Sequence, residues 1–379
     1  MITDGFNVNQ FRMSSSVGLS APLVGQSVLN GDGSNVGINS AELSDPASGE
    51  PPRWQGSLQP PCPGGPCENN LQMSWYLGDY DNAPDGSPAP RPIEYGVLPL
   101  RSFGDPIKHP MHGLVGALVV GPAGSRLCTE AEYTDTRERE ADRGTAMSAN
   151  VCDVQGRLLY RDLVAVLQDA VRLQRDGHAV PNLEGAEEPD DYGSKAVNYR
   201  TEPLWARRGG DPSVAFDERN SFDYAHALST KGFKAASGEV VCRSGVRAMT
   251  SEWGAEHACD SETPTFVAAA GREVRMRLVH PGGHTRQQAI SLAGHAFTPY
   301  PYLNGSRAMA PTSGEALRDA WIVEGHVNGM GPMTTGNLLV RAGGARQVPM
   351  DYLWRSQASF LFDGGQWGML RVLPDTRTQ

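Results

Sequence analysis

Short apolar segments separated by glycine- and proline-rich turns recur along this chain, and they limit the folds that it can adopt. The 379 residues include 44 glycines and 28 prolines, and long amphipathic helical patterns are scarce. This combination is typical of proteins built from many short strands joined by turns. A chain of this length can form two or more domains, each with its own core. The composition therefore predicts an all-β protein.

The clearest strand pattern lies at residues 271–279, where three apolar side chains alternate with Arg275 and Arg277. Alternation of this kind predicts a strand with one buried and one exposed face. Residues 115–120 form a shorter apolar run of the same type. Residues 157–173 leave two structures open. Their leucines and valines fit a helical stripe, and residues 163–167 equally fit a strand that is buried on both faces.

Residues 129–154 are charged and contain few large aliphatic side chains. Such a segment cannot bury much apolar surface, so we expect it to be a linker between two domains. Cys128 and Cys152 lie at or near its two ends.

The six cysteines are typical of an exported protein with three disulfides. They allow 15 pairings, and the sequential one is the simplest hypothesis. It joins Cys62 to Cys67, Cys128 to Cys152, and Cys242 to Cys259. This predicts a periplasmic or extracellular location. The first residues lack the basic and apolar regions of a signal peptide, so we expect that a leader has been lost.

The charge distribution excludes some classes of function. The net charge is −10 and no run of lysine or arginine occurs, which argues against a nucleic-acid partner. No apolar run approaches the length that a membrane span needs, so no span is predicted.

Three histidines are candidate metal ligands. His109 and His112 lie three residues apart on a glycine-flanked approach to the apolar run 115–120, near the mouth of a buried strand. His295 follows Gly294 at the end of another short apolar run. Imidazoles in such positions can bind copper. The alternative is structural, with His109 hydrogen-bonded to the backbone and His295 fixing a turn.

Eight segments, taken in order, carry a resemblance to a known family. They are residues 32–37, 74–79, 109–122, 198–205, 274–281, 292–297, 351–353 and 365–372. Together they resemble the multicopper oxidases, which consist of consecutive cupredoxin β-sandwich domains, and among these the large bacterial branch that includes manganese-oxidising enzymes. The resemblance implies two consecutive cupredoxin-like Greek-key sandwiches, at 1–128 and 155–379, joined by the linker at 129–154. It also implies that residues 158–171 open the second sandwich as a strand.

The resemblance fails at the copper ligands. Where the family carries His-Pro-x-His-x-His, this chain has residues 288–293, which begin with Gln288 and contain no histidine. The family's His-Cys-His motif corresponds to residues 356–360, which contain neither histidine nor cysteine. A blue copper needs two imidazoles and a thiolate. The sequence therefore predicts that the redox centre has been lost.

These observations predict a degenerate multicopper-oxidase-like module, a structural or partner-binding part of an exported copper oxidase system with residual copper at His109 and His112. The chain begins in what resembles the middle of a cupredoxin domain. We therefore expect the first sandwich to lack its opening strands and an upstream segment or partner cupredoxin subunit to complete it. One alternative is a copper-dependent oxidoreductase, acting on phenols or metal ions, whose remaining ligands come from that segment or partner. Another is a sandwich that binds extracellular ligands such as glycans.

Overall fold

The structure, a computed structural model, describes residues 18–26, 75–106, 108–142, 147–171, 174–175, 178–179, 194–207, 228–242, 259–282, 287–297 and 326–375. Within them the chain is mainly strand, which confirms the all-β prediction. The predicted Cys62–Cys67 disulfide lies outside these residues. The number of domains and their boundaries stay a prediction.

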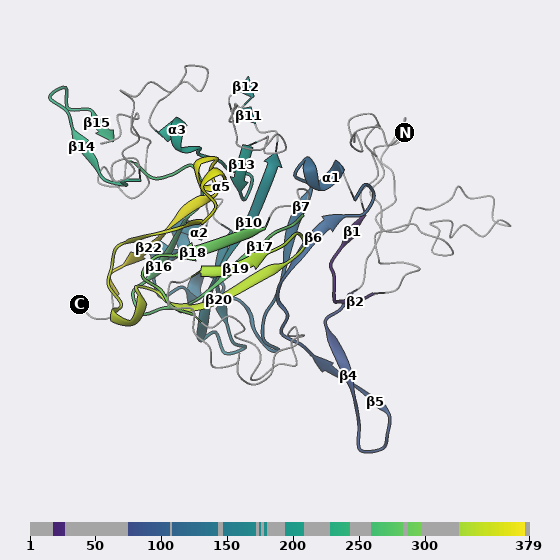
Figure 1. The fold of residues 1–379 in the computed structure, drawn as a ribbon. Coiled ribbons are helices and arrows are strands. Elements are labelled where there is room, and N and C mark those ends of the chain that lie inside the picture. Colours follow the sequence, from purple (N-terminus) through teal and green to yellow (C-terminus); the bar gives the residue numbers. More distant parts are fainter. Residues whose placement is uncertain are drawn as a thin grey trace, which may run out of the picture.

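Two sheets form the centre of the molecule (Figure 1). The first has the order β20–β17–β10–β9–β8, with β13 paired to β10; its strands are β8 (Arg126–Leu127), β9 (Ser148–Cys152), β10 (Leu158–Val171), β13 (Ser194–Val197), β17 (Glu273–Val279) and β20 (Thr335–Arg341). The second has the order β16–β22–β21–β18–β19; its strands are β16 (Thr265–Ala269), β18 (Gln288–Leu292), β19 (His326–Met330), β21 (Asp351–Ser356) and β22 (Trp367–Leu373). The pairs β10–β17 and β16–β22 are parallel, and the other pairs of these two sheets are antiparallel.

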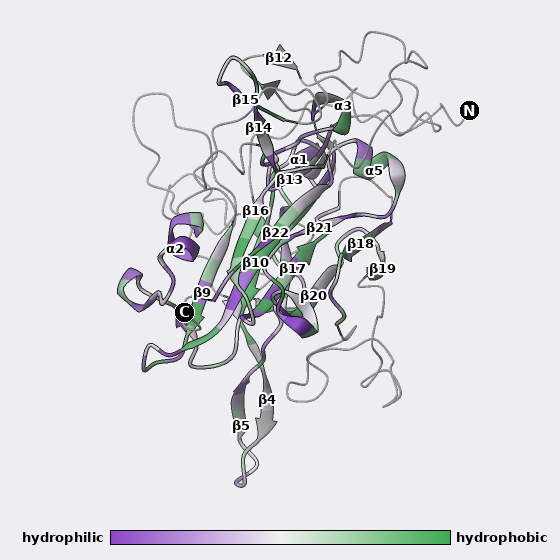
Figure 2. Ribbon diagram, turned by 90° about the vertical axis from the view of Figure 1, so that its left-hand side faces the viewer, coloured by the Kyte–Doolittle hydropathy of each residue, from purple (hydrophilic) through white to green (hydrophobic). Residues whose placement is uncertain are grey.

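The apolar faces of the two sheets meet in one core, so the two sheets form a β-sandwich (Figure 2). Alternate residues of β10, β16, β17, β18, β20, β21 and β22 point into it, as the pleat of a strand requires. Met276 and Leu278 come from the first sheet, and Ile290, Leu292 and Trp354 come from the second; each is 1% exposed or less. The sandwich therefore rests on the strand alternation that the sequence carries.

Strand β10 is buried on both faces, which decides between the two structures that periodicity left open. Leu163, Ala165 and Leu167 point into the sandwich core. The two valines between them pack on the other side, against Val97. A strand with both faces covered reads as a continuous apolar run, and such a run can imitate a helical stripe.

A smaller sheet covers the outer face of β10 and β17. It has the order β1–β6–β7, and its strands are β1 (Leu19–Ser20), β6 (Gly96–Ser102) and β7 (Val115–Val120). The strand predicted at 115–120 is thus confirmed. Polar contacts join the smaller sheet to the sandwich. Arg275 of β17 lies 2.5 Å from Glu94, and the Val97 backbone N–H of β6 donates to Asn337 of β20.

This contact corrects the prediction that β17 has an exposed face. Arg277 is fully buried, and its Nε lies 2.8 Å from a carboxylate oxygen of Asp162 on β10. Arg275 lies over the Tyr160 ring at 3.6 Å. Both arginines face the smaller sheet instead of solvent. Alternating charge marked the correct strand, but no local pattern in the sequence indicates that the smaller sheet covers it.

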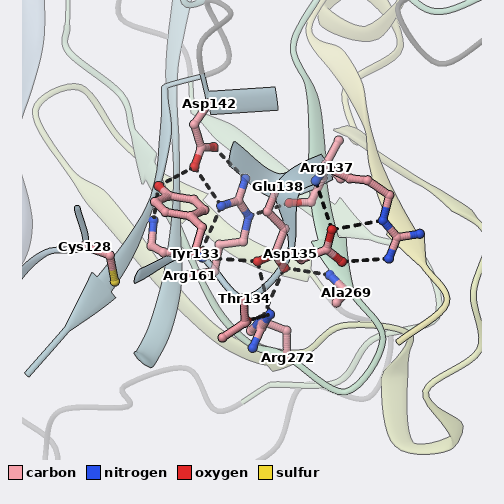
Figure 3. Close-up of polar contacts among 12 residues, drawn as sticks. Cys128, Tyr133, Thr134, Asp135, Arg137, Glu138, Asp142, Arg161, Ala269 and Arg272 are labelled. Atoms are coloured by element: carbon pink, nitrogen blue, oxygen red, sulfur yellow. Dashed lines mark hydrogen bonds and ion pairs between the residues drawn. The ribbon is translucent and has the colours of Figure 1, made fainter. Parts of the chain in front are cut away.

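The segment 129–154 contains regular structure that its charged composition does not predict. It holds a 3₁₀ helix (Glu130–Glu132), the helix α2 (Thr136–Asp142) and strand β9. Glu138 on α2 is fully buried, and it accepts hydrogen bonds from the Ala269 backbone N–H and from Arg272 (Figure 3). Asp142 forms a 2.6 Å ion pair with Arg161 on β10. The charges of this segment therefore fasten it to the sandwich.

The remaining elements lie at the periphery. Strands β2 (Gly25–Gln26) and β3 (Trp75–Tyr76) pair, and the hairpin β4 (Gly78–Asn82)–β5 (Pro88–Pro92) projects from the body (Figure 1). The other short elements are α1 (Lys108–Met111), β11 (Gln174–Arg175), β12 (His178–Ala179), α3 (Leu204–Arg207), β14 (Gly232–Lys234), β15 (Val240–Cys242), the 3₁₀ helix η7 (Gly344–Arg346) and α5 (Ser359–Asp363).

Two of the expected disulfides are confirmed, Cys128–Cys152 and Cys242–Cys259. Disulfides of this kind persist in oxidising compartments. In the part of the chain that the structure describes, no helix is both long and apolar enough to span a membrane.

Candidate metal centre

His109 lies in α1, directly ahead of β7. A carboxylate oxygen of Asp105 accepts a hydrogen bond from the Lys108 backbone N–H at 2.9 Å, which satisfies a free donor at the start of the helix. Gly113 has a φ of 84°, a conformation that glycine adopts at little cost, and it turns the chain from the helix toward β7. Between these two residues the His109 ring packs against β6 and is 4% exposed.

Ser102, at the end of β6, holds the His109 ring. The Oγ of Ser102 lies 2.8 Å from Nδ1 of His109, and it also accepts the backbone N–H groups of Gly18 and Gly104, both at 3.3 Å. A hydroxyl group accepts two hydrogen bonds and donates one. Ser102 therefore donates its proton to Nδ1, and the neutral His109 ring carries its own proton on Nε2. In this tautomer neither ring nitrogen has a lone pair for a metal ion.

His112 does not join His109 in a pocket. It ends the same helical turn, with its backbone N–H bonded to the His109 carbonyl at 3.2 Å. Yet the His112 side chain is exposed, whereas the His109 side chain is buried. One imidazole therefore faces the interior and the other faces solvent. The arrangement does not fit the pair of converging ligands that the sequence predicts.

His295 follows β18 and is 3% exposed. Its Nε2 accepts two backbone N–H groups, those of Gly343 and Gly344, each at 3.2 Å. Its Nδ1 lies 2.8 Å from the Ala293 carbonyl and donates to it. The ring also meets the edge of Tyr352, with centroids 4.7 Å apart. Every polar atom of this imidazole is used inside the chain.

The glycines around His295 explain why its ring can be enclosed. Gly343 and Gly344 have φ values of 85° and 68°, so their N–H groups can converge on one acceptor. A Cβ atom on Gly344 would lie 2.6 Å from the Gly294 carbonyl oxygen. Burial lowers the pKa of His295 below its usual 6.5, which favours the neutral ring that this geometry needs. The structural interpretation of His295 accounts for all of these contacts.

The structure does not assemble the three candidates into one centre. His109 contacts β6, His295 contacts the residues that lead into η7, and His112 faces solvent. His280 does not join them: it is 1% exposed, and its Nδ1 accepts the Gly282 backbone N–H at 3.4 Å, so it caps a turn.

The sulfur atoms of the four described cysteines all lie in disulfides. Within the described residues one group brings three metal-capable side chains within 4.8 Å, namely Cys128, Glu132 and Cys152. The two sulfurs form a disulfide, so neither is a thiolate. Glu132 pairs with Arg126 at 2.6 Å, and hydrogen bonds from Arg126 and the Thr129 N–H lower its pKa to about 2. This group therefore does not fit a copper ion.

Two of the positions at which the resemblance expects metal ligands, Gln288 and Ser356, are buried in the sandwich together with Gln366. These three polar residues lie at one end of the second sheet: Gln288 begins β18, Ser356 ends β21, and Gln366 directly precedes β22. Each is 1% exposed or less. Their side chains contain four polar atoms without a hydrogen-bond partner. Neutral amide and hydroxyl groups of this kind are poor ligands for copper. The sequence identified two of these positions by the missing histidines but could not predict that the replacements lack partners.

Two further acidic residues form ion pairs close to the second sheet. Glu202 pairs with Arg207 of α3 at 3.0 Å, and burial raises the pKa of Glu202. Asp351 on β21 pairs with Arg371 on the neighbouring strand β22 at 2.9 Å.

No family model matches this chain, and no curated protein matches it. Among solved structures it is similar to one described as a multicopper oxidase, with 12% identity and a TM-score of 0.40 over 95% of this chain and 71% of the other. It is also similar to a Cu-containing nitrite reductase (NirK) from Thermus scotoductus SA-01, with 15% identity and a TM-score of 0.34 over 76% and 43% of the two chains. At TM-scores below 0.5, neither similarity assigns a site or an activity to this chain.

Proposed function

We propose that this chain is a multicopper-oxidase-like module without a redox copper centre, which serves as a structural, partner-binding part of an exported copper oxidase system. The observation that carries the proposal is that the nitrogen and sulfur atoms that could bind copper are already bonded within the chain. The lone pairs of His109 and His295 are directed at groups of the same chain. The four described cysteines form two disulfides. Copper bound here would have to displace these bonds.

The donor set therefore does not fit a copper ion that changes oxidation state. A blue-copper site needs a thiolate together with two imidazoles whose lone pairs converge on one point. Exported copper proteins meet oxidising conditions, which suits the two disulfides. A chain with these features is better suited to support a partner than to transfer electrons.

The open edge of β7 supports the partner-binding part of the proposal. In the sheet β1–β6–β7, as far as the described residues go, β7 has a neighbouring strand on one side. The Tyr199 hydroxyl bonds to the backbone of Val115 and covers the beginning of the other side. Val119, farther along, is 36% exposed. An open strand edge is suited to pair with a strand of another chain.

Two measurements test the proposed function. The purified chain is dialysed against Cu(II) and assayed for bound copper, for the charge-transfer band of a copper–thiolate bond, and for oxygen uptake with a phenol or Mn(II). We expect substoichiometric copper, no such band and no uptake. A stoichiometric copper with oxygen uptake would contradict the proposal and favour a copper-dependent oxidoreductase.

To test partner binding, the chain is mixed with cupredoxin proteins encoded beside it, and complex formation is measured by size-exclusion chromatography. We expect a complex that Val119→Lys weakens, because a lysine on a strand edge opposes pairing. Val154→Lys is the matched control, since Val154 is 66% exposed in a turn away from β7. Equal loss in both variants, or no complex with any of these proteins, counts against the role.

A further inference from the structure

Three polar residues lie side by side at one end of the sandwich core. In the register of the second sheet, Ile290 on β18 faces Ser356 on β21. The Ser356 backbone N–H donates to the carbonyl of Gln366, directly before β22, at 3.0 Å. Gln288 lies two residues before Ile290, so its side chain is on the same face of β18. The three side chains thus come from three adjacent strands.

This face of the sheet points into the core. Ile290, Leu292 and Trp354, which alternate with outward residues on β18 and β21, all belong to the apolar core cluster. Gln288, at the other end of β18 from Leu292, and Ser356, at the end of β21, continue the same alternation. Polar side chains therefore replace apolar ones at this end. Directly paired residues on neighbouring strands have Cβ atoms about 4.5–5.5 Å apart, and diagonal neighbours about 7–8 Å.

Four atoms of these side chains have no hydrogen-bond partner: both amide atoms of Gln288, Oγ of Ser356 and Oε1 of Gln366. Gln366 is held in place, because its Nε2 donates to the Gln168 carbonyl at 3.0 Å. Ser356 and Gln366 are fully buried, and Gln288 is 1% exposed. Buried polar groups are satisfied almost without exception in folded proteins, and a group left without a partner destabilises the fold. These four atoms are therefore available to bind a small molecule that can both donate and accept hydrogen bonds.

We propose that the end of the sandwich core at Gln288, Ser356 and Gln366 is an internal hydrated site, in which ordered water molecules bridge the three side chains. The four atoms include both donors and acceptors, which suits water because it both donates and accepts. None of the three side chains carries a charge, so the site does not select an ion. Their burial limits the ligand to a very small molecule. Buried waters typically make about three hydrogen bonds to such groups.

A crystal structure of the full chain, at a resolution that shows ordered water, tests the site directly. We expect at least one water within hydrogen-bond distance of Ser356 Oγ and of one of the two glutamines. Density for a metal ion at this position would overturn the proposal. So would a dry site in which the three side chains bond to one another.

Stability gives a second test that does not depend on crystals. If water bridges Ser356, then Ser356→Ala removes a hydrogen bond and lowers Tm by roughly 2–4 °C. If Ser356 Oγ has no partner in solution, the same change removes an unsatisfied group and leaves Tm equal or higher. Gln288→Met makes the same test at the second residue. A fall in Tm supports hydration, and an unchanged or higher Tm overturns it.

The controls are matched in chemistry and differ in burial. Ser237→Ala alters an exposed serine in the β14–β15 turn, and Gln287→Met alters the exposed neighbour of Gln288. Neither should change Tm. If they lower it as much as Ser356→Ala and Gln288→Met do, the effect does not come from the buried site and the hydration proposal fails.

Discussion

The two ends of strand β18 place polar groups in the sandwich in opposite ways. Just beyond its C-terminal end, His295 has all of its polar atoms bonded to backbone groups of the same chain. At its N-terminal end, Gln288 has none of its side-chain polar atoms bonded to the chain. Both residues are almost completely buried. The comparison therefore distinguishes a buried residue whose hydrogen bonds are all made within the chain from one whose proposed partners are bound water.

The difference teaches that a buried histidine is not by itself evidence of a metal site. His295 and His109 each have the residue type and the burial of a ligand. In both, the lone pair that would bind a metal accepts a hydrogen bond from the chain itself. The tautomer and the neighbouring donors decide whether an imidazole can bind a metal.

The largest effect should come from removing the ring at the closed end. His295→Ala leaves two buried N–H groups, those of Gly343 and Gly344, without an acceptor and opens a cavity. We expect a loss of about 3 kcal/mol in the free energy of unfolding, measured by urea denaturation. Gln288→Met, at the other end, should cost only about 1 kcal/mol. Equal losses of unfolding free energy in the two variants would contradict the proposed difference between the two ends.

A substitution that keeps the ring but disturbs its donors should have the next largest effect. Gly344→Ala places a Cβ atom 2.6 Å from the Gly294 carbonyl oxygen at a φ of 68°. We expect a loss of about 2 kcal/mol from backbone strain and the displaced N–H. Gly238→Ala is the control for strain alone, since Gly238 also has a positive φ but no atom within 4 Å of the added Cβ. Gly344→Ala should lower the free energy of unfolding clearly more than Gly238→Ala does, and an equal loss would contradict the role of the Gly344 N–H.

Stability should depend on pH through His295. Burial lowers its pKa in the folded state below the usual 6.5, so the unfolded chain takes up a proton first as the pH falls. The contribution of His295 is therefore complete above about pH 6.5 and is lost below it, with a slope of at most about 1.4 kcal/mol per pH unit. The test compares the free energy of unfolding of the natural chain and His295→Gln across this range. Parallel pH profiles would contradict the assignment.

The smallest effect is expected at the exposed histidine. His112→Ala should change the free energy of unfolding by less than about 0.5 kcal/mol, because its side chain faces solvent. It should also leave the bound copper measured after dialysis unchanged. If copper is retained and lost only in this variant, His112 is a ligand and the residual site predicted from the sequence exists.

Much of the fold could be predicted because it depends on local patterns. The strand at 115–120 and the alternation at 271–279 appear where the apolar residues place them. The helix and strand within 129–154 were not predicted, because Glu138 and Asp142 look like solvated charges in the sequence. Their partners, Arg272 and Arg161, lie far away along the chain. Contacts between distant charges cannot be recognised from local composition.

The candidate site was less accessible to sequence reasoning. Spacing identified His109 and His112 as a pair, but it gave no indication of which ring faces the interior. The serine that fixes His109 belongs to a different strand, and the N–H groups that surround His295 come from glycines about 50 residues later. The missing histidines at residues 288–293 were visible in the sequence, and they motivate the proposal that this chain holds no redox copper.

The protonation of the two buried imidazoles tests the central claim most directly. Long-range ¹H–¹⁵N spectra of the labelled chain assign the tautomer of each histidine and can be repeated after Cu(II) is added. The account predicts a proton on Nδ1 of His295 and on Nε2 of His109, with neither ring broadened by copper. Opposite tautomers, or loss of either ring signal at one equivalent of copper, would contradict it.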